Sequence, residues 1–190
     1  MMTQIKNKHN LAWIDMEMTG LDPEKEAIIE IASIVTDPDL KILSNGPNLV
    51  IHQPAKLLKS MDEWNTNHHR DSGLIEEVKN SKITVKKAEA MTLDFIGEYC
   101  VHKHTLLCGN AVHHDRRFII RYMPKLHEFL HYRHIDVSAV KSLINLWYPK
   151  DKNVPKKKKT HRALDDIRES IEELRYYREH YFRQIPVTHD

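Results

Sequence analysis

Residues 11–21 read LAWIDMEMTGL, an apolar run that ends in alternating acids. This pattern predicts a β-strand from Leu11 to Asp15. Asp15 and Glu17 lie two residues apart at the end of that strand, and the strand period of two puts both carboxylates on one face. Two close carboxylates repel each other unless a cation lies between them, and a divalent metal ion meets that need. A solvated strand end is the competing interpretation, which this stretch alone does not exclude.

The segments that follow this strand predict an α/β domain. Apolar runs predict a second strand at 27–36, whose one charge is Glu30, and a third at 42–51 that is interrupted at 45–47. Short turns between these strands favour an antiparallel meander. Further strands are expected at 105–108 and 134–136, and helices at 62–80 (one or two), 84–102, 115–122, 125–131, 137–147 and 160–184. The expected fold class is α/β, with a mixed five-stranded sheet flanked by helices in a single domain over 1–190.

The composition narrows the class of protein. The chain of 190 residues is 41% hydrophobic and 29% charged, which is enough apolar material for one sizeable core. No apolar run approaches the ~20 residues of a membrane-spanning helix, so no membrane association is expected. The polar start of the chain lacks a signal-peptide core, which predicts a cytoplasmic protein. A net charge of +2 neither requires nor excludes nucleic acid as a partner. Cys100 and Cys108 are expected to be buried thiols.

A third acid, Asp115, follows the predicted strand 105–108 by way of residues 109–114. In open α/β sheets, binding sites gather at strand ends and at the helix starts beyond them, which makes Asp115 a candidate site residue. Aspartate at a helix start is also an ordinary N-cap, and Asp115 on its own fits that role as well.

The last predicted helix opens with His161, Asp165 and Asp166. At about 100° per residue, its apolar side chains form one core face. Asp165 lies roughly 150° from the centre of that face and is expected in solvent, whereas Asp166 lies at about 110°, at the border that a strand-end cleft can reach. His161 can face the same site only from the loop before the helix. A histidine there suits a general base, with an ordinary surface histidine as the alternative.

These four carboxylates and one histidine gain meaning together, because an α/β sheet can gather all of them on one edge. Oxygen ligands without clustered cysteine suit hard ions such as Mg²⁺ or Mn²⁺. Two such ions ~3.5–4 Å apart are a common apparatus for phosphodiester hydrolysis. The residues therefore favour a metal-dependent nuclease.

Three motifs in this chain resemble those of the DEDDh group of 3′→5′ exonucleases. They carry the stretches WIDMEMTGL, GN followed by DRRF, and HRALDDIRES, and they lie at 13–21, 107–118 and 160–170. Further stretches are similar to the oligoribonuclease family, namely MDEWN at 61–65, HYR at 131–133 and DVS at 136–138. The likeness extends from about residue 10 to residue 180, nearly the whole chain.

The resemblance implies an RNase H-like fold, a homodimer and 3′→5′ hydrolysis of short single-stranded RNA to 5′-mononucleotides. The implied substrates are roughly two to five nucleotides long, chiefly dinucleotides. By matching positions, the resemblance implies two divalent metal ions, Mg²⁺ or Mn²⁺, with His161 as the general base. The implied metal ligands are Asp15, Glu17, Asp115 and Asp166.

The resemblance also implies how the substrate is held. Leu21 and Trp64 would wedge or stack the two bases, a task that aromatic rings perform without reading sequence. His69, together with Tyr132 and Arg133 from the other subunit, would hold the 5′ phosphate, because the planar guanidinium fork suits a terminal phosphate. Such a cap would explain selection for short RNA, since a longer strand has nowhere to go.

Ser138 is implied as a further contact to the same phosphate. Two positions depart from the family pattern: Ala111 stands where serine is common, and His114 where glutamine is common. His114 keeps its place as an implied contact near the substrate sugar and phosphate. These departures affect detailed contacts and leave the proposed chemistry intact.

Several alternatives stay open at this point. An exonuclease of the same fold that trims longer single strands would share the catalytic residues, and substrate length discriminates the two. A binding module that has lost its chemistry is disfavoured because all four acids and the histidine are present. Without the resemblance, Trp64 fits a half-buried core residue, and Tyr132 and Arg133 fit ordinary surface residues. The lysine-rich loop 150–159 fits a solvated loop better than a phosphate-attracting one.

Overall fold

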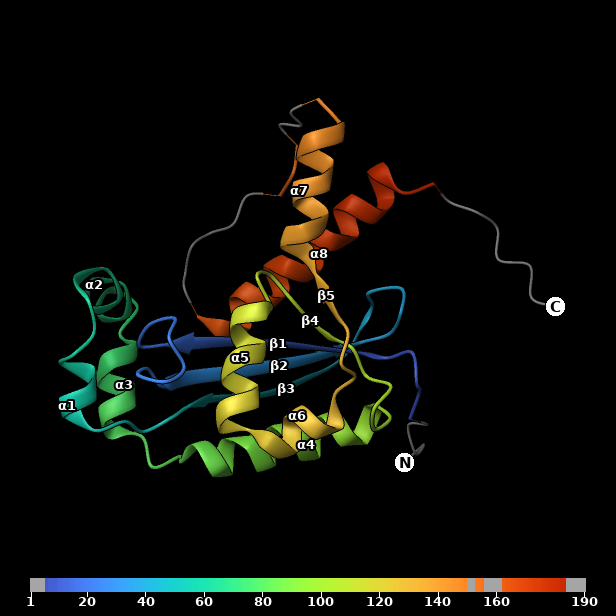
Figure 1. Ribbon diagram of the computed structural model, residues 1–190. Helices are drawn as coiled ribbons and strands as arrows, with labels where there is room; N and C mark the ends of the chain where they lie inside the picture. Colours follow the sequence, from blue (N-terminus) through green and yellow to red (C-terminus); the bar gives the residue numbers. More distant parts are fainter. Residues whose placement is uncertain (1–5, 150–152, 156–161, 184–190) are drawn as a thin grey trace.

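The computed structural model describes residues 6–149, 153–155 and 162–183, and a five-stranded mixed sheet forms its centre (Figure 1). The strands are β1 (Leu11–Met18), β2 (Ile28–Thr36), β3 (Ile42–Val50), β4 (Leu107–Gly109) and β5 (His134–Asp136). Their order across the sheet is β3-β2-β1-β4-β5. The first three strands pair antiparallel, whereas β4 and β5 run parallel to β1. The predicted meander and the predicted mixed sheet are both confirmed.

Two strands differ most from prediction, and β4 is also shifted, from the expected 105–108 to 107–109. β1 continues past Asp15 to Met18, so that Glu17 lies inside the strand and pairs directly with Glu30 of β2. β3 was expected to break at 45–47, and this is wrong, because the strand continues with shifts in its register against β2. β3 is an outer strand of the sheet, where Pro47 is tolerated although it has no N–H to donate. A Cβ at Gly46 would collide with the ring of Phe95, so this position requires glycine.

Eight helices are described, and one was not expected from the sequence. The segment predicted as one or two helices forms two, and a short helix precedes them at the end of β3. Thr84 caps the longest of the middle helices, as predicted, by accepting a hydrogen bond from the N–H of Lys87. The helices are α1 (Ala55–Leu58), α2 (Glu63–Asp71), α3 (Leu74–Asn80), α4 (Val85–Tyr99), α5 (His113–Tyr122), α6 (Pro124–Phe129), α7 (Val137–Trp147) and α8 (Ala163–Tyr181).

The strand period divides β1 between two apolar layers. Ala12, Ile14 and Met16 point into the core that α4, α5 and α6 cover. Leu11 and Trp13 point to the opposite face, which α7 and α8 cover (Figure 1). Since side chains alternate along a strand, the odd-numbered acids of β1 lie on the α8 face. The same alternation that builds the core therefore aims two carboxylates at the start of α8.

The remaining small helices lie beyond the end of β1. Figure 1 shows α1, α2 and α3 gathered beside the end at which β1 stops. A small apolar cluster attaches them to β2, and its buried members are Ile29, Leu58, Met61, Leu74 and Val78. Among the described residues, no helix is both long and apolar enough to cross a membrane. Cys100 and Cys108 are buried free thiols, as predicted.

Candidate active site

Three carboxylates meet where β1 ends and α8 begins. Asp15 and Glu17 come from the α8 face of β1, and Asp166 comes from the first turn of α8. One oxygen from each of them lies within 4.8 Å of the other two, which is the spacing of a set that can share a metal ion. The side chain of Asp165 is half exposed, and its carboxylate oxygen lies 4.0 Å from Nη1 of Arg168. The structure thus brings Asp166, and not its neighbour, to the cluster.

Asp115 joins this edge from the other layer. It is the third residue of α5, and the N-cap position of that helix belongs to Val112. The interpretation of Asp115 as an N-cap is therefore wrong. Its buried carboxylate instead accepts a hydrogen bond of 3.0 Å from the backbone N–H of Met16, the residue between the two acids of β1. A helix from one layer and a strand thus fix Asp115 beside the cluster.

Two acids of this edge, Glu17 and Asp115, have strongly raised pKa values. The pKa of Glu17 is raised to about 9, mostly by burial and also by the negative charges of Asp166, Glu30 and Asp115, against the attraction of Arg162. Burial also raises the pKa of Asp115. The three carboxylates that add to the shift of Glu17 show that negative charge gathers here without enough protein cations to balance it. The residues present therefore fit a hard divalent cation, whose preferred ligands are carboxylate oxygens.

Two of the expected substrate residues are exposed near this edge. Leu21 follows β1 with 58% of its surface exposed, and Trp64 of α2 is 67% exposed. Trp64 is therefore not a core residue. Its ring stacks on that of His68, with the ring centroids 4.5 Å apart. Both side chains are open to a ligand that approaches beyond the end of β1.

His69 lies deeper than a surface phosphate contact. It is 1% exposed, its Nε2 is 2.9 Å from the carbonyl oxygen of Met18, and its Nδ1 is 3.9 Å from a carboxylate oxygen of Glu17. This places the imidazole against the acid-lined edge. His161 and the predicted basic loop at 150–159, apart from residues 153–155, lie outside the described residues.

His114 and Ser138 lie on the side of the edge formed by β4 and β5. The ring centroid of His114 is 4.0 Å from that of His113, and partial burial lowers its pKa. Ser138, in the first turn of α7, donates to the side-chain oxygen of Asn110 at 2.9 Å. In the described structure, its hydroxyl is part of a polar network inside the chain.

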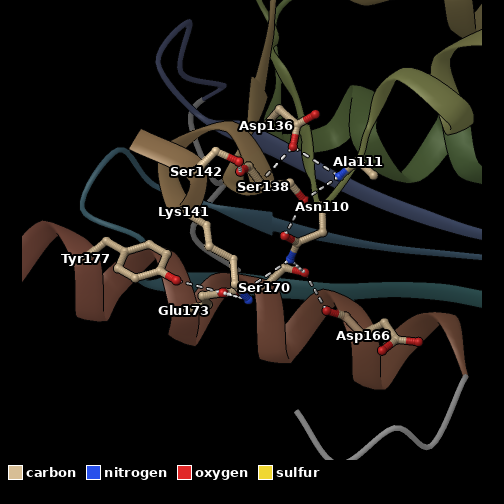
Figure 2. Close-up of polar contacts among 10 residues, drawn as sticks. All are labelled: Asn110, Ala111, Asp136, Ser138, Lys141, Ser142, Asp166, Ser170, Glu173 and Tyr177. Carbon is tan, nitrogen blue, oxygen red and sulfur yellow. Dashed lines mark hydrogen bonds and ion pairs between the residues drawn. The ribbon is translucent and has the colours of Figure 1, made fainter. Parts of the chain in front are cut away.

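That network fixes the turn between β4 and α5 (Figure 2). Ala111 adopts a left-handed backbone with φ of 49°, which is unfavourable for a residue with a Cβ. Its N–H donates to Asp136 and to Ser138, each at 3.0 Å, and these bonds compensate for the strained conformation. Asp136 also accepts from the N–H of Ser138 and so caps α7. The turn that leads to Asp115 is therefore held by the end of β5.

The same network reaches the helix that carries Asp166. Asn110 donates to Ser170 at 2.7 Å, and Ser170 donates to the backbone carbonyl of Asp166 at 2.7 Å (Figure 2). The buried carboxylate of Glu173 accepts from Lys141 and from Tyr177, each at 2.9 Å. Sequence reasoning missed Glu173. The signal was available, since Glu173 follows Asp166 by seven residues and so lies on nearly the same face of α8.

Tyr132 and Arg133 lie at the end of the strands opposite to the acids. They directly precede β5, which runs parallel to β4 and β1, so they lie where β1 begins and the acids lie where it ends. Tyr132 is 72% exposed, and the guanidinium carbon of Arg133 is 5.3 Å from the centre of its ring. Arg133 lines a cavity of about 690 Å³ with Lys8, His9 and His104. Within one chain, the structure does not bring these two residues to the acids.

Comparisons with known proteins identify a family that this chain resembles. Residues 12–174 match the family model described as Exonuclease, RNase_T. An oligoribonuclease from Coxiella burnetii is 56% identical over 171 residues, which cover 90% of this chain and 93% of that protein. An oligoribonuclease from Haemophilus influenzae is 53% identical over 177 residues, covering 93% and 97%, and one from Pseudomonas aeruginosa is 50% identical over 179 residues, covering 94% and 99%.

Solved structures of lower identity share the fold. Exonuclease I from Methylocaldum szegediense matches with a TM-score of 0.67 at 16% identity over 90% of this chain. E. coli exonuclease I in complex with a dT13 oligonucleotide matches with a TM-score of 0.66 at 14% identity over 89% of this chain. The present chain spans 41% of the length of each of these two proteins. The predicted RNase H-like fold is confirmed.

Proposed function

We propose that this chain, which belongs to the oligoribonuclease family of exonucleases, cleaves short RNA with two divalent metal ions held at the acid-lined end of β1. Membership of the family makes it a 3′→5′ exoribonuclease that acts on short oligoribonucleotides. We propose dinucleotides as its main substrates and 5′-mononucleotides as its products. We further propose that residues 1–190 form a single exonuclease domain, which acts in the cytoplasm.

Asp15, Glu17, Asp115 and Asp166 are the proposed metal ligands. The convergence of three of their carboxylates within 4.8 Å is the observation that carries the proposal. Mg²⁺ and Mn²⁺ are the proposed ions, because the donors are all carboxylate oxygens. When bound, such ions activate a water molecule and stabilise the leaving oxygen of a phosphodiester. The raised pKa of Glu17 supports the assignment, since burial and neighbouring carboxylates raise it and a bound cation would stabilise the ionised form.

The other roles concern protons and substrate. We propose His161 as the general base that removes a proton from the attacking water, since histidine titrates near neutral pH. Leu21 and Trp64 are proposed to wedge and stack the bases, a role that the exposure of both side chains supports. His69, His114 and Ser138 are proposed to contact the sugar and phosphates.

A homodimer is the proposed state of the working enzyme. Tyr132 and Arg133 lie at the wrong edge of their own sheet to cap a phosphate beside their own acids. A second copy can present them there. Apolar side chains on α7 and beyond α8 also support an interface, because large exposed apolar groups mark contact surfaces. These side chains are Leu143, Leu146, Trp147 and Phe182.

A time course on end-labelled RNAs of two to seven nucleotides tests the proposed function. We expect metal-dependent release of mononucleotides, with the dinucleotide consumed fastest, and no release with chelator. The rival proposal, an enzyme that trims longer single strands, predicts instead that rates rise or stay level with length. Equal cleavage with and without divalent metal would contradict the metal assignment.

A further inference from the structure

A single guanidinium joins three elements at the start of α8. Arg162 directly precedes that helix, and its Nε and Nη2 donate to one carboxylate oxygen of Glu30 at 3.1 and 3.0 Å. The other oxygen of Glu30 accepts from the N–H of Ala163 at 3.3 Å. Glu30 is fully buried in β2, directly opposite Glu17. Because a buried carboxylate needs a partner, this contact fixes Arg162 in place.

The same guanidinium also holds α3. Its Nη1 donates to one oxygen of Glu77 at 2.8 Å, and its Nη2 donates to the other at 2.9 Å. Isolated surface ion pairs contribute little, largely because ordering two long side chains costs entropy. Here Glu30 has already ordered the arginine, and the bidentate fork is the most directional form of such a contact. The pair between Arg162 and Glu77 is therefore expected to hold α3 effectively.

α3 belongs to the part of the molecule that offers bases a stacking surface. It packs against α2, which carries Trp64 and His69, and a two-residue connection joins the two helices. Besides Arg162, this part is attached through the small apolar cluster around Leu74 and Val78 and through the contact of His69 Nε2 with the carbonyl oxygen of Met18 at 2.9 Å. The start of α8 places Asp166 in the acid cluster. Arg162 thus ties the helix pair of Trp64 to the helix of a proposed metal ligand.

We propose that Arg162, anchored by Glu30, is a positioning residue that sets where Trp64 stands relative to the metal-binding carboxylates. This inference rests on the proposed function, because it takes Trp64 as the base-stacking side chain. If the tie is lost, the bases of a bound dinucleotide no longer align with the acids. The loss should weaken productive binding of the substrate and leave the chemical step intact.

The exposed end of the tie is the place to test it. Removing Arg162 would leave the buried carboxylate of Glu30 without its cation and could unfold the chain. Glu77→Ala removes only the contact to α3. Glu76→Ala is a matched control, because Glu76 also lies in the first turn of α3 but pairs with Lys79. Both variants lose one acid from the same helix start, so any effect of the helix dipole is shared.

Steady-state kinetics on a dinucleotide give the readout. We expect Glu77→Ala to raise KM about 3- to 10-fold with kcat within about twofold of the parent, and Glu76→Ala to change neither. In a Trp64→Ala background, Glu77→Ala should have no further effect on KM, since a residue that acts through Trp64 cannot act without it. If the effects of Trp64→Ala and Glu77→Ala on KM multiply in the double variant, the inference is overturned. It is also overturned if Glu77→Ala has the same KM as the Glu76→Ala control.

Different results would contradict the proposed function and the positioning role of Arg162. If the parent chain does not cleave dinucleotides, or if Trp64→Ala leaves KM unchanged, the proposed function is wrong at that point. If both hold and only the Glu77 results are absent, the proposed function stands and the positioning role of Arg162 is wrong. Thermal unfolding of each variant shows whether a raised KM merely follows from an unfolded fraction.

Discussion

The two ends of β1 differ in how complete a site a single chain forms there. At the end of β1, acids from β1, α5 and α8 lie close together, partly or fully buried and fixed by backbone and side-chain contacts. At the beginning of β1, Tyr132 and Arg133 stand in solvent beside an open cavity with basic lining. The first edge is built by the core itself, whereas the second offers cationic groups that lie far from the acid cluster.

The difference suits a division of the proposed tasks between the two ends of the strands. Chemistry needs fixed geometry, and a single folded chain supplies it at the acid edge. Capping a phosphate needs a group that approaches from outside, and in the proposed dimer Tyr132 and Arg133 would supply it to the second copy. The contrast separates residues whose loss should stop the reaction from those whose loss should change the choice of substrate.

Neutralising a ligand at the acid edge should have the largest effect. Asp166→Asn is expected to lower kcat/KM for a dinucleotide by about 10⁴-fold or more, because a weakened metal site leaves transition-state charge unmatched. Asp165→Asn is the matched control and should be nearly silent, since Asp165 points away to Arg168. Comparable losses in both variants would show that the acid edge does not hold the metal.

Removing the proposed base should have the next largest effect. His161→Ala is expected to lower kcat by ~10²–10⁴-fold and to leave dinucleotide binding largely intact, because a general base acts mainly in the transition state. Single-turnover rates at saturating RNA measure this directly. Normal turnover with tenfold weaker binding would make His161 a substrate contact instead.

The opposite edge should affect substrate choice more than chemistry. Arg133→Ala removes a charge-assisted phosphate contact of roughly 1.5–3 kcal/mol, so kcat/KM for dinucleotides should fall ~10–150-fold. A seven-nucleotide RNA should lose far less, because it cannot use the cap fully. Measuring both substrates with one preparation separates this outcome from simple unfolding.

A mixing experiment tests whether that cap acts in the other subunit. Arg133→Ala chains and Asp15→Asn chains should regain activity when they exchange subunits, since one heterodimer site then has intact acids from one chain and an intact cap from the other. A fully active monomer would contradict the proposal that the cap acts in the other subunit. So would a mixture no more active than its two parent variants after proven subunit exchange.

The smallest expected effect is on stability. The pKa of Glu17 is raised from 4.5 to about 9, so the folded chain binds more protons than the unfolded chain between these pH values. Stability of the metal-free protein should therefore fall as pH rises from 4.5 towards 9, which thermal unfolding would show as a falling Tm. Mg²⁺ should recover more stability at high pH than at low pH. Glu17→Gln should flatten this slope.

Local patterns in the sequence were enough for much of the fold. The alternation in 11–18 predicted that Asp15 and Glu17 share a face, and the helix period separated Asp165 from Asp166. Such predictions succeed because the periods of strands and helices are set by backbone geometry, which residues close in sequence share. The interruption expected at Gly46 failed because the packing of Phe95 and the edge position of β3 accommodate it.

Only the tertiary structure decided how the site is assembled. Glu30 stood out in the sequence as one charge in an apolar strand, but its partner, Arg162, lies 132 residues away. Asp115 looked like a helix cap until the fold placed it against the backbone of β1, 99 residues distant. Local periodicity fixes the direction in which a side chain points. The partner that it meets depends on how strands and helices pack, which no short stretch of sequence contains.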